Sequence, residues 1–255
     1  MSPVVSLLVL IALSMVAVIS VSVITSILSP SKHMQSKSNL HVARKIHHFF
    51  SGVVIIVIYH SFFDANMAAG VLFLSCAGVI LAHIARSLSP RFRAAFVKLF
   101  GAIMRPREVV ELPSAFFFLL SCGISIACFR KDVSMLTMLY LSLGDPVASF
   151  FGVLIDSGRF VLPGAGGKSL AGCLAASSFC ALTTLGYHAV LCGSAASVAA
   201  LLPTALLGGV IGGLAELITI STLDDNLTIP LLSGAMLLAV EYVTAAVWWT
   251  PACVL

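Results

Sequence analysis

Charged residues are scarce in this chain of 255 residues. Only 9% of the residues are charged and 60% are apolar, whereas charged residues make up about 25% of an average soluble domain. The 14 basic and 10 acidic residues are too few to cover the surface of a soluble fold of this size. The composition therefore excludes a compact soluble enzyme, a disordered chain, a nucleic-acid-binding domain and a disulfide-stapled secreted module. It predicts a polytopic membrane protein.

Other signals are absent as well. The seven cysteines are an odd number without CxxC spacing, so we expect neither a disulfide framework nor a cysteine metal site. No alternating strand pattern of a β-barrel is present. The first apolar run, residues 4–28, has no basic segment before it and exceeds the roughly 7–15 residues of a signal-peptide core. We expect it to be a retained anchor helix.

Long apolar runs are plentiful. About 20 apolar residues in a helix cross a bilayer core, and this measure predicts an all-α bundle of about eight transmembrane helices. The predicted spans are approximately 4–29, 47–63, 67–86, 112–129, 133–155, 170–192, 197–220 and 227–249. No repeat or linker divides the chain, so we expect a single membrane domain over residues 1–255. Its parts are an anchor helix with a loop (1–42), a motif region (43–230) and the last helix (227–249).

The basic residues favour one side of this topology. All but Arg130 and Lys131 of the 14 basic residues lie in or beside four segments that eight spans place on the same side. These segments are 30–46, 87–111, 156–169 and 221–226. By the positive-inside rule, we expect them to face the cytoplasm and both termini to face the other side.

Two of the basic groups are candidate phosphate sites. Arg44 lies on one helix face with His48, with Lys45 beside them, at the start of the second span. The alternative is a flanking charge that anchors a helix to anionic headgroups. The loop 89–111 contains Arg105 and Arg107. Its apolar spacing predicts an amphipathic surface helix, which serves either as an anchor or as the entry of a lipid.

Asp145 interrupts the fifth span together with Gly144 and Pro146. Proline removes a backbone donor and disfavours helical geometry at the residue before it, and glycine adds freedom, so we expect a locally opened helix. Ser149 and Gly152 share a helix face with Asp145. A carboxylate at this depth costs about 2.5–3.5 kcal/mol on insertion scales and is a functional candidate. The alternative is a structural carboxylate paired with a basic neighbour.

A glycine-rich segment leads into the sixth span. Gly166 and Gly167 let backbone N–H groups converge, Lys168 adds a cation, and Ser169 is a good N-cap at a helix start that attracts anions. A Walker loop would need glycine at position 162, which is leucine, and a buried strand before it. The segment is therefore a phosphate-site candidate of another kind.

Polar residues also mark the start of the last span. Oxygens of Asp225 and Asn226 suit Mg²⁺, which prefers few carboxylates together with substrate phosphates. The alternative is a capped turn, with Asp225 or Asn226 as N-cap and Pro230 in the first helical turn. Glu216 lies in the span before, and Glu241, deeper in the last span, has no evident partner.

In this order, the motifs resemble the CTP-dependent lipid kinase family, which includes dolichol kinases, phytol kinases and fungal-type CTP-dependent diacylglycerol kinases. The matching segments are 44–48, 105–109, 144–152, 168–172 and 225–230. The resemblance implies an endoplasmic-reticulum enzyme that transfers the γ-phosphate of CTP to a lipid alcohol. Ala171 stands where dolichol kinases tend to carry glutamate, so diacylglycerol is favoured over phytol and dolichol. Cys173 stands where the closer branches usually carry serine.

The resemblance also implies a division of roles in phosphoryl transfer. Catalytic roles fall to Arg44, Lys45 and Lys168, which clamp the triphosphate, and to Asp145, which binds Mg²⁺ or another divalent cation together with Asp225 or orients the lipid hydroxyl. The implied nucleotide contacts are Gly144, Ser149, Gly152, Gly166, Gly167, Ser169, Asn226, Arg105 and Arg107. The expected partners are CTP and a lipid alcohol, without nucleic acid. A phosphatidate cytidylyltransferase, a membrane transporter and a non-catalytic family member are the alternatives.

Overall fold

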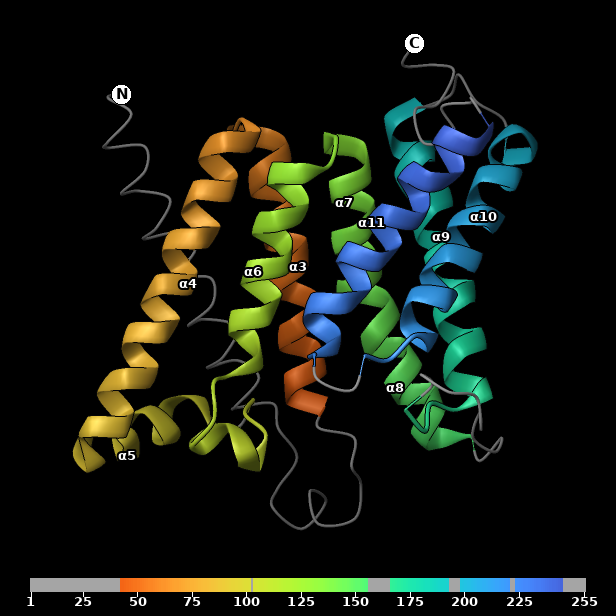
Figure 1. Ribbon diagram of the computed structural model, residues 1–255. Coiled ribbons are helices and arrows are strands. Elements are labelled where there is room, and N and C mark those ends of the chain that lie inside the picture. The colour runs from red at the N-terminus through yellow and green to blue at the C-terminus, as the bar shows by residue number, and fades with distance from the viewer. Residues whose placement is uncertain (1–41, 102, 156–165, 193–197, 221–222, 245–255) are drawn as a thin grey trace. The chain divides into compact units, whose positions relative to one another are not determined.

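The computed structural model describes residues 42–101, 103–155, 166–192, 198–220 and 223–244. The regular elements in these ranges are helices, which confirms the all-α prediction (Figure 1). The predicted span 4–29 and most of the loop 156–169 lie outside the described residues. Contacts divide the chain into two compact units, one ending at Gly123 and one starting at Ile124. The single membrane domain stays a prediction.

The first unit contains α3 (Val42–Phe62), α4 (Ala65–Leu88), α5 (Pro90–Phe100), the 3₁₀ turn η1 (Pro106–Val109) and most of α6 (Ser114–Cys128). The side chain of Asp64 accepts a hydrogen bond from the Met67 N–H at 2.9 Å and caps α4. Ser89 caps α5 in the same way, with Pro90 at the first helical position. No residue of α5 is buried, as we expect for the amphipathic surface helix.

The second unit contains α7 (Lys131–Leu139), the π-helical turn η2 (Tyr140–Gly144), α8 (Asp145–Leu154), α9 (Leu170–Cys192), α10 (Val198–Leu217) and α11 (Asp225–Thr244). The Tyr140 hydroxyl is buried and lies 2.7 Å from the Thr184 hydroxyl. This pair satisfies two polar groups inside an apolar core. The core is formed by Val133, Leu136, Tyr140, Cys180, Ile211 and Leu237.

The predicted local opening at Asp145 is present as the π turn. Pro146 has no N–H, and in a regular α-helix its ring would clash with the carbonyl of Ser142, so a wider turn relieves both problems. The expected departure of Asp145 from helical geometry is wrong, because its φ of −60° and ψ of −49° are helical. Gly144 is helical too. A Cβ there would lie 3.0 Å from the Cys180 Sγ, so glycine provides space at this position.

Helices α9 and α10 lie side by side and pack through glycines of α10 (Figure 1). A Cβ on Gly209 would lie 2.6 Å from the Ser177 carbonyl oxygen and 2.7 Å from the Ala181 Cβ. Gly213, one turn further, faces the Ser177 side chain. Small residues four positions apart let two apolar helices approach closely. In lipid such packing replaces the hydrophobic effect as the force that holds helices together.

Five helices of the described chain are long and apolar enough to cross a membrane. They are Ala65–Leu88, Lys131–Leu154, Leu170–Val190, Val198–Leu217 and Asp225–Thr244, close to predicted spans. The predicted span 112–129 corresponds to α6, which is apolar but shorter. The predicted span 47–63 corresponds to α3, whose first turns contain Arg44, Lys45, His47 and His48.

Candidate functional site

Lys168 is the centre of a charged cluster in the second unit. Its Nζ donates hydrogen bonds to Glu216 Oε1 at 2.7 Å and to Asp225 Oδ2 at 3.0 Å. Asp145 also interacts electrostatically with this ammonium group. The starts of α8, α9 and α11 and the end of α10 therefore contribute to one cluster. Residues up to 80 positions apart in the sequence meet there.

The backbone beside Lys168 requires glycine. Gly166 and Gly167 have φ values of 56° and 79°, in the left-handed region that other residues rarely adopt. A Cβ on Gly166 would also meet the Thr219 side chain at 2.9 Å. Ser169 Oγ accepts the Gly172 N–H at 3.1 Å, so the predicted N-cap of α9 is confirmed. The turn thus presents Lys168 at a capped helix start, the end of a helix that attracts anions.

Helix α8 approaches this helix start closely. A Cβ on Gly152 would lie 2.8 Å from Ser169 Oγ, and one on Gly172 would lie 2.7 Å from the Ala148 carbonyl oxygen. The Ser149 hydroxyl donates to the Asp145 carbonyl oxygen at 2.8 Å. Gly152 therefore permits the contact of two helices, while Ser149 stabilises the first turn of α8.

The side chain of Asp225 contacts Lys168 and does not cap α11. The cap is Asp224, whose Oδ1 accepts the Asn226 N–H at 3.0 Å and whose carbonyl oxygen accepts the Leu227 N–H at 2.9 Å. The predicted alternative of Asp225 or Asn226 as the N-cap is therefore wrong, because the acid one residue earlier takes that place. Asn226 is buried at the start of the helix.

The electrostatics of the cluster favour a charged lysine. Burial alone would lower the pKa of Lys168, but Glu216 and Asp225 outweigh burial and raise this pKa above its ordinary range. Three carboxylates, those of Glu216, Asp225 and Asp145, thus act on the Lys168 ammonium group. Among the described residues, no group of three or more histidine, cysteine, aspartate or glutamate side chains converges on a metal position.

The other basic candidates belong to the first unit, where Glu108 holds Arg44 and the backbone of Arg105. Arg44 Nη1 donates to Glu108 Oε1 at 3.1 Å, and the Arg105 N–H donates to Glu108 Oε2 at 3.0 Å. Lys45 is half-buried. Arg107 is exposed and pairs with Glu111 at 3.8 Å. Burial alone would raise the pKa of Glu108, but Arg44 and backbone N–H groups outweigh it and hold the pKa below its usual value.

Arg86 is almost fully buried and fixes the same loop. Its Nη1 donates to the Glu108 carbonyl oxygen at 2.7 Å, and its Nη2 donates to the Glu111 carbonyl oxygen. The guanidinium also lies 5.1 Å from the centre of the Phe96 ring. From the sequence, Arg86 was one of several loop charges, whereas in the structure it is a buried support of the loop.

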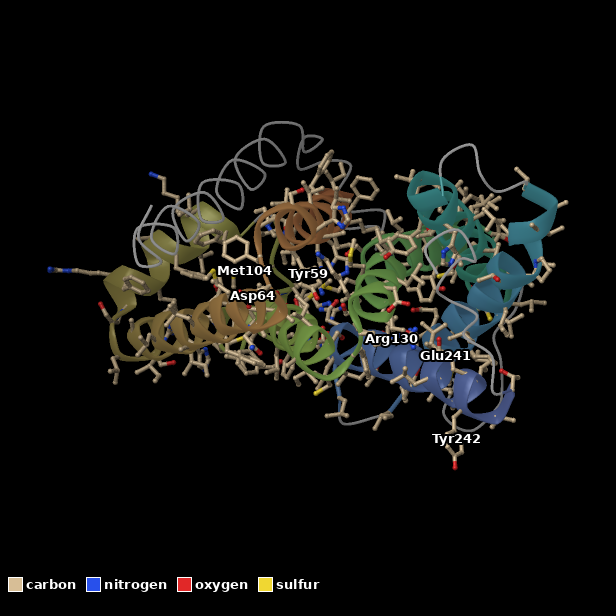
Figure 2. The ribbon with its side chains drawn as sticks, turned by 90° about the horizontal axis from the view of Figure 1, so that it is seen from above. Tyr59, Asp64, Met104, Arg130, Glu241 and Tyr242 are labelled. Atoms are coloured by element: carbon tan, nitrogen blue, oxygen red, sulfur yellow. The ribbon has the colours of Figure 1, made fainter. Side chains whose placement is uncertain are left out.

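A second charged network in the second unit gives Glu241 a partner. Arg130 donates to Glu241 Oε1 and Oε2, both at 2.8 Å, and to Asp132 Oδ2 at 2.9 Å. Figure 2 shows Arg130 and Glu241 close together, while Tyr242 points away from them. This network joins the start of α7 to the last turns of α11, away from Asp225 at the start of α11.

Sequence reasoning missed two acids that organise these sites, Glu216 and Glu108. Both are buried and accept hydrogen bonds from a cation far away in the sequence, Lys168 for Glu216 and Arg44 for Glu108. For Glu216 the available signal was its position near the end of a glycine-rich apolar span, where a charge is costly. For Glu108 the signal was its place in the 105–109 motif.

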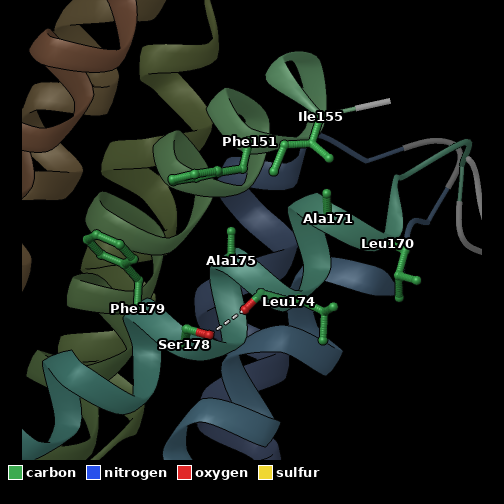
Figure 3. Close-up of a pocket in the computed structure, with 8 residues that line it drawn as sticks. All are labelled: Phe151, Ile155, Leu170, Ala171, Leu174, Ala175, Ser178 and Phe179. Atoms are coloured by element: carbon green, nitrogen blue, oxygen red, sulfur yellow. Dashed lines mark hydrogen bonds between the residues drawn. The ribbon is translucent and has the colours of Figure 1, made fainter. Parts of the chain in front are cut away.

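An apolar groove lies on the surface of α8 and α9 (Figure 3). Its volume is about 490 Å³. The Ser178 hydroxyl on its wall donates to the Leu174 carbonyl oxygen at 2.8 Å, so this hydroxyl makes no polar demand on the groove. Along α9 its lining starts at Leu170, which follows Lys168 and Ser169 in the sequence. Its lining is Phe151, Ile155, Leu170, Ala171, Leu174, Ala175, Ser178 and Phe179.

Comparison with known proteins identifies three relatives, each named CTP-dependent diacylglycerol kinase 1. The chain is 28% identical over 207 residues to the Eremothecium gossypii protein, which covers 76% of this chain and 65% of that protein. Its identity to the Saccharomyces cerevisiae protein is 26% over 213 residues, which covers 78% and 73% of the two chains. Its identity to the Schizosaccharomyces pombe protein is 30% over 153 residues, which covers 58% and 69%.

The chain thus spans slightly less than two thirds of the length of the E. gossypii relative. No protein-family model matches it, and no solved structure matches it at a significant level. The S. pombe match combines 30% identity with more than two thirds of that relative's length. These matches, together with the order of the motifs, lead to one assignment: the chain belongs to the CTP-dependent lipid kinase family.

Proposed function

We propose that the chain transfers the γ-phosphate of CTP to the hydroxyl of a lipid alcohol, with diacylglycerol preferred over phytol and dolichol. The observation that carries this proposal is the Lys168 cluster, which combines a charged lysine, a positive-φ glycine turn and a capped helix start. Each of these features favours phosphate. The printed names of the three relatives supply the donor and the acceptor.

Phosphoryl transfer depends mainly on positioning and charge neutralisation. In the proposed step, the lipid hydroxyl oxygen forms a bond to the γ-phosphorus while the bond from that phosphorus to the β,γ-bridging oxygen breaks. CDP leaves, and Asp145 accepts the hydroxyl proton. Lys168 and the N–H groups at the start of α9 neutralise the oxygens of the phosphate in transfer, and Asn226 contributes to nucleotide binding.

A divalent cation fits the donor set of this site. Mg²⁺ is usually bound by one or two carboxylates together with substrate phosphates, and Asp145 and Asp225 are the proposed carboxylates. When bound, the cation neutralises charge on the phosphates. Asp145 thus has two proposed uses, as a cation ligand or as the group that orients the acceptor hydroxyl and accepts its proton.

The apolar groove explains how a lipid can reach the same site. It runs along α9 from Leu170 to Phe179, a rise of about 13 Å at 1.5 Å per residue. That length suits part of an acyl or isoprenoid chain. A tail in the groove leaves the hydroxyl at the end of the groove beside Ser169 and Lys168.

The first unit contains the other basic residues that are proposed to bind the nucleotide. Arg44 and Lys45, in the first turn of α3, and Arg105 and Arg107, at the 3₁₀ turn η1, are proposed nucleotide contacts on the cytoplasmic side. Glu108 fixes Arg44 and the Arg105 backbone in place. The topology that goes with this proposal has about eight spans, in the membrane of the endoplasmic reticulum.

Reconstitution of the full chain tests the proposed function. Purified protein in phosphatidylcholine vesicles receives Mg²⁺ and labelled CTP or ATP, with diacylglycerol, phytol or dolichol as acceptor. We expect labelled phosphatidate from CTP and diacylglycerol, and a loss of the rate on chelation of the metal. In Asp145→Ala we expect kcat to fall at least about 100-fold, because charge stabilisation in the transition state is lost.

Asp132→Ala is the matched control, since Asp132 lies in the Arg130 network away from the cluster. It should keep the wild-type rate. If the wild-type protein transfers phosphate from neither nucleotide to any acceptor, the proposed function is wrong. If the wild-type protein is active and Asp145→Ala retains full rate, only the role of Asp145 is wrong.

A further inference from the structure

Glu216 is an acid in a place where an acid is costly. It lies in the last turn of α10, and only 6% of its surface is exposed. A carboxylate withdrawn from water costs several kcal/mol unless it is paired with a cation. Apolar residues of similar volume often replace a buried ion pair without loss of stability. Stability alone therefore does not account for this glutamate.

The contact of Glu216 with Lys168 is the closer of the two lysine contacts. It measures 2.7 Å, against 3.0 Å for Asp225. The side chain of Glu216 is 7% exposed, whereas that of Asp225 is 35% exposed. Coulombic attraction is stronger where water is excluded. Glu216 is therefore the stronger anchor of the lysine, and Asp225 is more open to solvent and to a ligand.

The second carboxylate oxygen of Glu216, Oε2, has no hydrogen-bond donor among the described residues. This oxygen is buried. A buried acceptor without a donor costs about 1–3 kcal/mol. The carboxylate thus has one described hydrogen-bonding partner, Lys168, and keeps it at an energetic cost.

The helix that carries Glu216 is firmly packed, whereas Lys168 has a long flexible side chain. Gly209 and Gly213 pack α10 tightly against Ser177 and Ala181 of α9, which fixes the helix that carries Glu216. Lys168 follows the glycine turn and extends a long flexible side chain. A rigid group that holds a flexible one is the arrangement expected of a support for a functional side chain.

We infer that Glu216 is a positioning residue, which holds the ammonium group of Lys168 beside Asp225 so that it meets the phosphate transferred from the nucleotide. This inference rests on the proposed function. It assigns Glu216 no contact with the substrate, since its action passes through Lys168. Asp225 remains available to the cation and the nucleotide while Glu216 keeps the lysine in place.

A double-mutant cycle on the reconstituted full chain tests this inference. In Glu216→Leu we expect kcat with CTP and diacylglycerol to fall about 10–100-fold, as for other supports of functional groups. The KM for diacylglycerol should stay unchanged, because the groove is untouched. Lys168→Met and the double variant should have the same kcat within about twofold, because Glu216 has nothing left to position.

Three further variants complete the test. Glu216→Gln should recover part of the kcat lost in Glu216→Leu, because its amide oxygen can still accept a hydrogen bond from Lys168. The double variant replaces a buried pair by apolar groups and should fold even if Lys168→Met alone does not. Glu241→Gln is the matched control, since Glu241 pairs with Arg130 at 2.8 Å, a distance close to the 2.7 Å between Glu216 and Lys168, but lies outside the cluster. It should leave kcat unchanged.

The outcomes separate this inference from the proposed function. Wild-type protein without transfer to any acceptor refutes the proposed function, and with it the ground for this inference. An active wild type with a folded Glu216→Leu variant of undiminished kcat refutes the inference alone. So does a double variant whose kcat falls by the product of the two single effects, because Glu216 would then act independently of Lys168.

Discussion

The packing of α10 on α9 makes a quantitative prediction for Gly209→Ala. The added methyl group would lie 2.6 Å from the Ser177 carbonyl oxygen and 2.7 Å from the Ala181 Cβ. One of these atoms belongs to the backbone and the other is fixed to it, so neither can rotate away. The two helices must separate, and such overpacking costs about 1–3 kcal/mol. For a chain of this size, that loss lowers the melting temperature by about 2–12 °C.

Thermal unfolding of the purified protein in detergent measures this effect, with Gly186→Ala as the control. Gly186 lies in α9, and a Cβ there meets nothing within 4 Å. Alanine favours an exposed helix interior by up to about 1 kcal/mol over glycine, so the control should be neutral or slightly stabilising. If Gly209→Ala melts at the same temperature as Gly186→Ala, the close contact of α9 and α10 is not as described.

Three further changes have definite expected outcomes. Arg86→Lys should destabilise the loop around Glu108 by about 1–3 kcal/mol, because the guanidinium reaches the two carbonyl oxygens from two nitrogens in a rigid fork, which the single nitrogen of lysine does not reproduce; faster tryptic cleavage within 101–113 would reveal it. Stabilisation by Glu108 should be present above the ordinary glutamate pKa of about 4.3 and disappear as the pH falls through its lowered folded pKa. A pH series of melting temperatures should show this loss in the wild type and not in Glu108→Gln. Gly167→Ala should weaken CTP binding, because a φ of 79° costs a residue with a Cβ about 1–2 kcal/mol; Gly78→Ala, in α4, should not.

The positions of several helices could be predicted from the sequence because local physics decides them. The run 170–192 coincides with α9, since Ser169 caps its start and apolar residues fill it. The predicted span 67–86 is close to α4, whose ends are set by Asp64 and Ser89. The glycine turn at 166–167 was also predictable, because convergence of N–H groups before a helix requires positive φ.

The partners of the charges could not be predicted. Lys168 and Glu216 are separated by 48 positions, and Arg44 and Glu108 by 64. No local rule joins residues so distant, because their pairing depends on which helices become neighbours. The helical geometry of Asp145 was missed for a related reason. The missing N–H and the ring of Pro146 predict a departure from regular α-helix near this residue. The departure lies in the π turn Tyr140–Gly144, before Asp145, and Asp145 itself is helical.

The π turn at 140–144 also sets the rotation of α8 about the helix axis relative to α7. A π turn contains about one residue more than the α-helical turn it replaces. Removing one residue would restore a regular helix and rotate one half against the other by about 100°. Leu136 could then face the core, or Asp145 could face Lys168, but not both. This segment should therefore tolerate changes of side chain far better than changes of length.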